Sequence, residues 1–305
     1  MRSRATLLGL FVIHVFAGWL YGDKGEVLVD SLRRHGFDAT LETSVPVRRR
    51  FRRRGRDELW IGHFTHYSAG DLPERYVAIQ SEPMWIADAW WSMQPHYLPM
   101  VSGALEVWDY HEADRPIIEG LGRRFTHVPC GYSPLHERWH ADALSTIEKP
   151  DIDVLFVGGM NPRRTQAIES LVASGLRVEV VTYDAVVHGA PLHRLIARSK
   201  LSLQMHRSEI PEDHGIDLFR FDHVLANGVP VLHERVTPRS PFDALFMDRI
   251  QFFDLPDIVS AVHSRLDDLD TSRQEARDTQ EWFKQEIAFD QYVPFDRIQG
   301  LLDAR

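Results

Sequence analysis

Cysteine is nearly absent from this sequence, which has only Cys130 among its 305 residues. A single cysteine excludes a disulfide bond within the chain. Disulfides accumulate in proteins of oxidising compartments, so their exclusion favours a reducing environment. We therefore expect a cytoplasmic protein.

Long hydrophobic runs are also scarce. The apolar stretch from Leu7 to Leu20 follows a basic start, as in a signal peptide, but it is short for a membrane span and contains His14. Because buried strands of parallel sheets are almost entirely apolar, a first buried strand is the better interpretation, with a signal peptide as the alternative. We expect no integral membrane segment.

Excess positive charge is missing from the chain as a whole. The net charge of -9 argues against a protein that coats nucleic acid generally. The negative excess lies in residues 141–305, because residues 1–140 contain equal numbers of basic and acidic residues. A solvated loop is the simplest interpretation of the one arginine run, and contact with nucleic acid, an anionic glycan or an anionic membrane surface is the alternative. The run comprises Arg48, Arg49, Arg50, Arg52, Arg53, Arg54 and Arg56.

Strand-like and helix-like segments alternate along the chain, which predicts an α/β fold with parallel sheets. In the first part we expect strands at Leu10–Phe16, Ala39–Glu42, Leu59–Phe64, Tyr76–Gln80, Leu105–Asp109 and Phe125–Val128, and helices at Gly25–His35 and Ala113–Leu121. In the second part we expect strands at Val154–Val157, Arg177–Val181, Leu201–Met205 and Val229–Leu232, and helices at Thr165–Ala173, Pro191–Arg198 and Asp217–Ala226. Residues 133–151 lose the apolar periodicity, so we interpret them as a linker between two Rossmann-like units that face each other across a cleft.

The segment IDVLFVGGMNPRR places Gly158 and Gly159 between a buried strand and a helix. Glycine there lets a ligand approach the backbone, and the start of the helix supplies amide donors for an anion. Arg163 and Arg164 at the same end oppose the helix dipole unless an anion binds. A diphosphate would resolve this conflict, and a tight turn with two solvated arginines is the alternative. Neither GxGxxG nor a P-loop occurs here, so neither a dinucleotide cofactor nor ATP hydrolysis is indicated.

Three further blocks suggest a family. The segment LANGVPVL resembles the nucleotide-sugar site of "group 1" glycosyltransferases with the GT-B fold. The segments VWDYHEADRPIIEGLGRRFTHVPCGYSP and DVLFVGGMNPRR resemble two blocks of a bacterial and viral branch of these enzymes. The similar blocks span about residues 76–236 and follow the order of that branch. The resemblance implies two facing Rossmann-like domains and transfer of a sugar from a nucleoside diphosphate sugar without a metal ion.

The implied domain order is an acceptor-binding domain at 1–140, a nucleotide-sugar-binding domain at 150–272, and C-terminal helices at 273–305 that cross back to the first domain. Arginines and helix amides would stabilise the leaving diphosphate, Glu234 or Asp217 would accept ribose hydroxyls, and Tyr183 would flank the base. The candidate donor-binding residues are Gly158, Gly159, Arg163, Arg164, Tyr183, His206, Arg207, Asp217, Arg220 and Glu234.

The chain departs from the family at the catalytic glutamates. Retaining members often carry two glutamates eight positions apart, and these positions are Gly215 and His223 here. The stereochemical outcome and the catalytic base therefore stay open. Candidates for a base that activates the acceptor hydroxyl are Asp23, Glu82 and Asp109, each of which follows a predicted strand. A structural alternative is that Glu82 caps a helix and Asp109 holds the turn after it.

The remaining aromatic, histidine and acidic clusters are weaker candidates for a functional site. Trp85, Trp90 and Trp91 follow Glu82 and would stack on a sugar or a base, although core packing is the simpler interpretation. His63 and His66 are three residues apart and have no acidic or cysteine partner in register, so a zinc site is not expected. The acidic segment Asp267–Asp270 lies in a polar helical stretch far from the site loops. The rival functions are a non-catalytic two-lobe protein that binds nucleotide sugars and a nucleotide-sugar epimerase.

Overall fold

The computed structural model describes residues 12–18, 21–43, 58–86, 94–182, 189–210 and 214–304. The chain divides into two compact units, which are 1–129 with 289–305 (unit 1) and 130–288 (unit 2). The arginine run at 48–56, Tyr183, Trp90 and Trp91 lie outside the described residues. No helix in the described ranges has both the length and the hydropathy that crossing a membrane requires.

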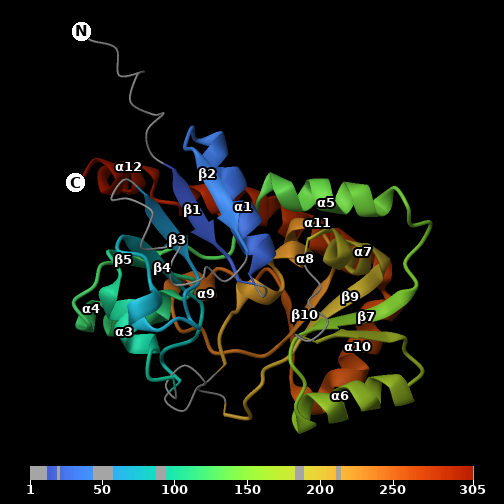
Figure 1. Ribbon diagram of the computed structural model, residues 1–305. Helices are drawn as coiled ribbons and strands as arrows, with labels where there is room; N and C mark the ends of the chain where they lie inside the picture. Colours follow the sequence, from blue (N-terminus) through green and yellow to red (C-terminus); the bar gives the residue numbers. More distant parts are fainter. Residues whose placement is uncertain are drawn as a thin grey trace. The chain divides into compact units, whose positions relative to one another are not determined.

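Unit 1 is built on one sheet of six parallel strands (Figure 1). The strands are β1 (Ile13–Phe16), β2 (Ala39–Glu42), β3 (Leu59–Gly62), β4 (Tyr76–Gln80), β5 (Glu106–Asp109) and β6 (Phe125–His127), in the order β2-β1-β3-β4-β5-β6. The helices are α1 (Gly22–Arg34), α3 (Tyr97–Gly103), α4 (Arg115–Gly120) and α12 (Phe295–Asp303), with 3-10 turns η1 (Ala69–Asp71), η3 (Glu112–Asp114) and η8 (Phe289–Gln291). Every residue of β1, β3, β4 and β5 is buried, as expected for parallel strands covered on both faces.

Unit 2 is built on a second parallel sheet, of five strands. These are β7 (Ile152–Val157), β8 (Val178–Val181), β9 (Ser199–Gln204), β10 (Val231–Glu234) and β11 (Gln251–Phe253), in the order β11-β10-β9-β7-β8. The helices are α5 (Pro134–Leu144), α6 (Pro162–Ala173), α7 (Ala190–Arg198), α8 (Asp222–Ala226), α9 (Pro241–Ala244), α10 (Ile258–Asp267) and α11 (Leu269–Glu286), with 3-10 turns η6 (Leu218–Arg220) and η7 (Leu255–Asp257). The prediction of an α/β fold with two parallel Rossmann-like sheets is confirmed.

The predicted linker at 133–151 is wrong over its first half, which forms α5. Ser133 caps this helix by accepting a hydrogen bond from the amide of Leu135 at 3.2 Å, and Pro134 occupies the first helical position. The helix lacks a simple apolar stripe because its buried face includes His136. A buried histidine in place of an aliphatic residue hides the helical period from a hydrophobicity pattern.

The C-terminal segment is shared between the units differently from the prediction. Helix α11 belongs to unit 2, and only residues 289–305 belong to unit 1. Asp290 accepts hydrogen bonds from Ser31 at 2.6 Å and from the Arg34 guanidinium, and Arg297 donates to Glu106 at 2.8 Å. Polar contacts as well as the apolar face of α12 therefore hold this segment to the first sheet.

Candidate functional site

In each sheet the strand order reverses at one position, where successive strands are added first on one side of a strand and then on its other side. In unit 2 the chain leaves β7 for β8 on one side and then returns to β9 on the other side. The loops that follow β7 and β9 therefore diverge, and α/β sheets of this order bind ligands at such a switch point, beyond the carboxyl ends of the strands. In unit 1 the equivalent point lies between β1 and β3.

The loop after β7 leads directly into α6. Asn161 caps α6 by accepting a hydrogen bond from the amide of Arg164 at 2.9 Å, and Pro162 follows it. The Asn161 side-chain amide also donates to the Arg207 carbonyl oxygen at 2.7 Å, so one side chain ties the loops after β7 and β9 together. Gly158 and Gly159 lie in the first of these loops, where the sequence placed them.

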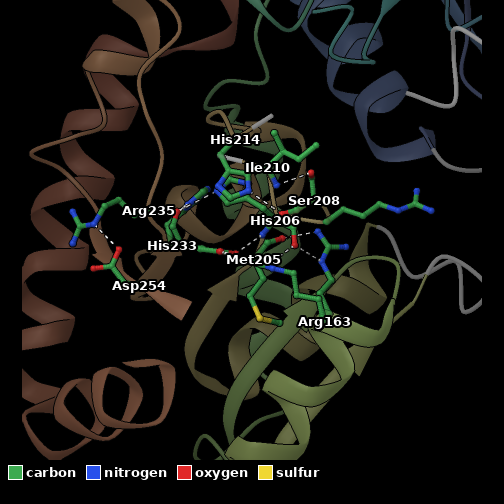
Figure 2. Close-up of polar contacts among 12 residues, drawn as sticks. Arg163, Met205, His206, Ser208, Ile210, His214, His233, Arg235 and Asp254 are labelled. Atoms are coloured by element: carbon green, nitrogen blue, oxygen red, sulfur yellow. Dashed lines mark hydrogen bonds and ion pairs between the residues drawn. The ribbon is translucent and has the colours of Figure 1, made fainter. Parts of the chain in front are cut away.

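Arg163 and Glu234 form an ion pair between the start of α6 and the end of β10. Nη1 of Arg163 donates to Oε2 of Glu234 at 2.9 Å, and Nη2 donates to Oε1. Nη1 also donates to the His206 carbonyl oxygen at 3.0 Å (Figure 2). The side chains are only 11% and 5% exposed, so this charge-assisted pair is largely shielded from water. Glu234 is thus an anion next to Arg163 that the chain itself supplies.

Arg164 takes a position that the sequence did not suggest. It is 1% exposed, and its guanidinium donates to the carbonyl oxygens of Gly159 at 2.6 Å, Met205 at 2.5 Å and His206 at 3.2 Å. Its carbon Cζ lies 5.4 Å from the centre of the Phe156 ring. The alternative of a solvated arginine is therefore wrong for Arg164, whose guanidinium holds the loops of the switch point together.

Two histidines, His206 and His233, contact Glu234, and a third, His214, packs on His206. His206 stacks on His214 with ring centres 3.8 Å apart, and its centre lies 5.4 Å from that of His233 (Figure 2). The His206 amide donates to Glu234 at 2.8 Å, and Nδ1 of His233 donates to the Glu234 carbonyl oxygen at 2.6 Å. Burial, together with the neighbouring imidazoles, lowers the pKa of His206 to about 2, and burial lowers the pKa of His233 to about 4. Both rings are neutral at pH 7.

Two of the remaining predicted donor residues lie near the histidine rings, since the charges of Asp217 and Arg220 act on the His233 imidazole. Asp217 and Arg220 pair with each other at 3.1 Å and are both partly exposed. Arg207 is exposed, and only its carbonyl oxygen takes part in the loop contacts given above. The structure thus brings Arg163, His206 and Glu234 into direct contact.

The switch point of unit 1 is lined by aromatic and polar side chains. Tyr21, after β1, stacks on His63, after β3, with ring centres 3.8 Å apart. Nε2 of His63 lies 2.8 Å from the Tyr110 hydroxyl, and the Tyr21 hydroxyl lies 3.1 Å from that of Ser81. Gly62 permits this approach of strands, because a Cβ there would lie 2.3 Å from the Phe16 carbonyl oxygen.

His63 is the most unusual residue of this group. It is 4% exposed, and its Nδ1 atom is buried without a hydrogen bond in the described part of the chain. Burial lowers the pKa of His63 to about 3, an effect that Asp23 opposes and Lys24 reinforces. The ring is therefore neutral at pH 7 and presents an unused nitrogen at the carboxyl edge of the sheet.

The three predicted acceptor bases have different surroundings. Asp23 is 5% exposed in the first turn of α1, where it accepts a hydrogen bond from the amide of Lys24 at 2.9 Å. Glu82 is partly exposed just beyond β4. Asp109 is fully buried and accepts hydrogen bonds from the His111 amide at 2.8 Å and from Gln80 at 2.9 Å. The turn-holding alternative for Asp109 is the one that the structure favours.

Asp109 belongs to a buried polar network that is shielded from solvent. Gln80 also donates to Asp114 at 3.0 Å and accepts from the Tyr97 hydroxyl at 2.6 Å. Burial and the neighbouring Asp114 raise the pKa of Asp109 well above its usual range. Burial raises the pKa of Asp114 to about 6. A carboxyl group with this burial and these partners is suited to fixing the loops after β4 and β5.

Solved structures that resemble the whole chain include two with TM-scores above 0.5. An alpha-glucosyltransferase in complex with UDP and a 13-mer DNA containing a HMU base has a TM-score of 0.59 and 10% sequence identity, and the match covers 97% of this chain and 100% of that one. HepE of Anabaena in complex with UDP-glucose has a TM-score of 0.54 and 12% identity, with 96% and 100% covered. The chain has the GT-B fold.

Sequence similarity gives no further information about the family of this chain. No protein-family model and no curated protein matches the chain. At 10% and 12% identity the structural likeness shows the fold, and it does not carry an activity. The expected GT-B fold is nevertheless confirmed, although it was inferred only from short blocks of sequence.

Sequence reasoning missed His63, Tyr110 and the stacked pair of His206 and His214 as structural groups. His63 was considered only as a zinc ligand with His66. Its position in the sequence would have pointed to it, because His63 is the first residue after β3, where a parallel sheet places its ligand-binding side chains. The pairing of His206 with His214 had no such signal, since it depends on how the loop after β9 folds back.

Proposed function

We propose that this chain is a glycosyltransferase that moves a sugar from a nucleoside diphosphate sugar to a hydroxyl acceptor. In this proposal unit 2 binds the donor and unit 1 binds the acceptor. The observation that carries it is that the Arg163 guanidinium is held in place and still has unused hydrogen-bond donors. A guanidinium has five N–H donors. Arg163 uses both hydrogens of Nη1 and one of Nη2 on Glu234 and His206, so Nε–H and one Nη2–H have no acceptor among the described residues.

A held cation with unused donors at the start of a helix suits a diphosphate leaving group. Breaking the bond between the sugar and the diphosphate builds negative charge on the diphosphate, and preorganised donors stabilise that charge as it develops. Glu234 keeps the guanidinium in one orientation, so less entropy is lost when the phosphate binds. In this account Arg164 is a positioning residue, which holds the carbonyl oxygens of the surrounding loops.

A uridine nucleotide is the donor we propose. Two of the similar structures, those described above, contain UDP and UDP-glucose. The stacked rings of His206 and His214 offer a flat surface beside the ion pair, and Asp217 lies on the loop that leads to α8. A base or a sugar ring would pack on the imidazoles, and a carboxylate would accept ribose hydroxyls.

The acceptor side is proposed to use His63 with Asp23. Nδ1 of His63 would accept the proton of the attacking hydroxyl, and the Asp23 carboxylate, which raises the pKa of His63 against the larger lowering by burial, would stabilise the imidazolium that forms. We propose a hydroxymethylated pyrimidine in DNA as the acceptor, because the similar alpha-glucosyltransferase was solved with DNA containing a HMU base. The arginine run at 48–56 would contact DNA phosphates.

Incubation with UDP-glucose labelled in the sugar tests this proposal. DNA with hydroxymethyluracil, unmodified DNA of the same sequence and a panel of glycans would serve as acceptors. The expected result is label in the hydroxymethylated DNA alone. Transfer to a glycan would keep the enzyme class and overturn the DNA acceptor. An altered sugar on the nucleotide without transfer would indicate an epimerase, and binding without any turnover would indicate a non-catalytic protein.

A further inference from the structure

Three helices of unit 2 bring four buried polar residues together away from the switch-point loops. His136 lies on α5, His193 on α7, and Asp222 and His223 on α8. Their exposed fractions are 0%, 0%, 1% and 2%. Helices α5, α7 and α8 lie side by side on one face of the sheet (Figure 1). Burying three imidazoles and a carboxylate is costly unless they bind one another or a shared ligand.

The side chains converge on one point. One ring nitrogen of His136, one carboxylate oxygen of Asp222 and one ring nitrogen of His223 all lie within 4.8 Å of one another. Nε2 of His223 lies 3.6 Å from Oδ1 of Asp222, and the ring centres of His136 and His223 are 4.6 Å apart. Tetrahedral ligands at about 2.0–2.2 Å from a zinc ion are about 3.3–3.6 Å apart, so small side-chain rotations would bring these atoms to the separations that an ion requires.

We propose that His136, Asp222 and His223 bind a divalent transition-metal ion, for which Zn²⁺ is the best match. Two imidazoles and one carboxylate are a donor set that zinc accepts, and it suits Mg²⁺ and Ca²⁺ poorly because those ions prefer oxygen ligands throughout. This inference does not depend on the proposed transferase activity. It also differs from the sequence-based expectation, which considered a zinc site only at His63 and His66.

His193 supplies the second layer of this site. Its Nε2 lies 3.1 Å from Nδ1 of His223, and Asn227 donates to its Nδ1 at 3.2 Å. A ligating histidine commonly hydrogen-bonds through its other ring nitrogen, which fixes the orientation of the ring. With the ion on Nε2 of His223, the Nδ1 hydrogen of His223 points to His193. The amide nitrogen of Asn227 also donates to the His223 carbonyl oxygen at 2.5 Å, so ion binding would move the His193 hydrogen to Nδ1 and release the bond from Asn227.

The ion would join segments that are distant in the sequence. It would connect the first helix of unit 2 to the short helix before β10, and α8 follows directly after the loop that contains Asp217 and Arg220. Because α8 has only five residues, its own hydrogen bonds stabilise it weakly. A bound ion would therefore stabilise unit 2 by fixing α8 against α5, as expected for a structural metal.

Metal content of the full chain tests this proposal. The protein would be purified without a histidine tag, incubated with ZnSO₄, desalted and analysed by elemental mass spectrometry alongside its thermal midpoint. The wild type should retain about one equivalent of metal and lose thermal stability in a chelator, whereas His136→Gln and Asp222→Asn should retain less than about 0.2 equivalent. His263→Gln, on α10 of the same unit, is the matched control and should behave as the wild type.

Each result decides the matter. Stoichiometric zinc or another first-row ion that both variants lose supports the site. No retained metal in the folded wild type overturns it, and so does stoichiometric metal that both variants keep. Circular dichroism of each variant before loading shows whether it is folded, and Asp222→Asn, which keeps the side-chain shape, provides the test if His136→Gln does not fold.

Discussion

Arg163 and Glu234 are paired through two hydrogen bonds with both side chains largely buried. Arg163 stands at the start of α6 and Glu234 at the end of β10, so the pair connects two loops of the unit 2 switch point. Its function in our account is to hold a cation in a fixed orientation for a diphosphate.

The first prediction concerns this pair. Arg163→Ala should weaken UDP binding by roughly 10- to 100-fold, because charge-assisted hydrogen bonds contribute about 1.5–3 kcal/mol each. Glu234→Gln should weaken it less, since the arginine stays but loses its orientation. Arg235→Ala is the matched control, because Arg235 is exposed and pairs with Asp254 (Figure 2). Isothermal titration measures all three, and equal affinities of Arg163→Ala and the control would refute the role of Arg163.

The second prediction concerns the neighbouring arginine. Arg164→Ala should lower the free energy of unfolding by about 3 kcal/mol, because it removes the Arg164 donors to the carbonyl oxygens of Gly159 and Met205, leaves Arg163 as the side-chain donor to that of His206, and opens a cavity. The exposed pair of Arg198 and Asp151 gives a control, and Arg198→Ala should change the thermal midpoint little. Urea unfolding distinguishes them. A normal stability of Arg164→Ala combined with lost UDP binding would instead make Arg164 a direct ligand of the donor.

The third prediction concerns pH. Burial lowers the pKa of His233 to about 4 from the ordinary 6.5. As the pH falls below 6.5, His233 becomes protonated in the unfolded chain but stays neutral in the folded chain. The contribution of His233 therefore lowers the free energy of unfolding progressively until the pH reaches about 4. At pH 5 the loss is about 2 kcal/mol. In urea unfolding, the free energy of unfolding of His233→Asn relative to that of the wild type should therefore be higher at pH 5 than at pH 7.5. A difference between the two proteins that does not change with pH would contradict the buried neutral state.

The fourth prediction concerns the switch point of unit 1. His63→Gln should reduce kcat for transfer by roughly 10²- to 10⁴-fold, as expected when a general base is removed, and should leave UDP affinity unchanged. His66→Gln, at an exposed position three residues later, is the control. Rates with labelled donor under saturating acceptor provide the measurement. A His63→Gln enzyme with normal kcat and a lower thermal midpoint would show that the residue only supports the fold.

Much of the fold was readable from the sequence because its strands are short, apolar and regularly separated by helices. The predicted strands at 39–42 and 76–80 have the observed limits. The helix predicted at 217–226 is instead a 3-10 turn followed by α8, because Asp217 and the buried Phe221 interrupt the helical backbone. Helix α5 was missed because His136 occupies its buried face, where a period of aliphatic residues would have marked it.

The candidate site was readable only in part. The glycines after β7 and the two arginines after them marked the right helix start, since this segment is local in sequence. The different fates of Arg163 and Arg164 depend on Glu234 and on the carbonyl oxygens after β9, which are about 40 to 70 residues away in sequence. Long-range partners of this kind leave no pattern that a single sequence reveals.

The most direct test of the central claim is a crystal structure of the wild-type chain with UDP. Our account predicts the β-phosphate within hydrogen-bonding distance of Nε or Nη2 of Arg163 and of the Arg163 backbone amide, with the Arg163–Glu234 pair intact. A diphosphate bound elsewhere on unit 2, with the start of α6 empty of phosphate, would contradict it.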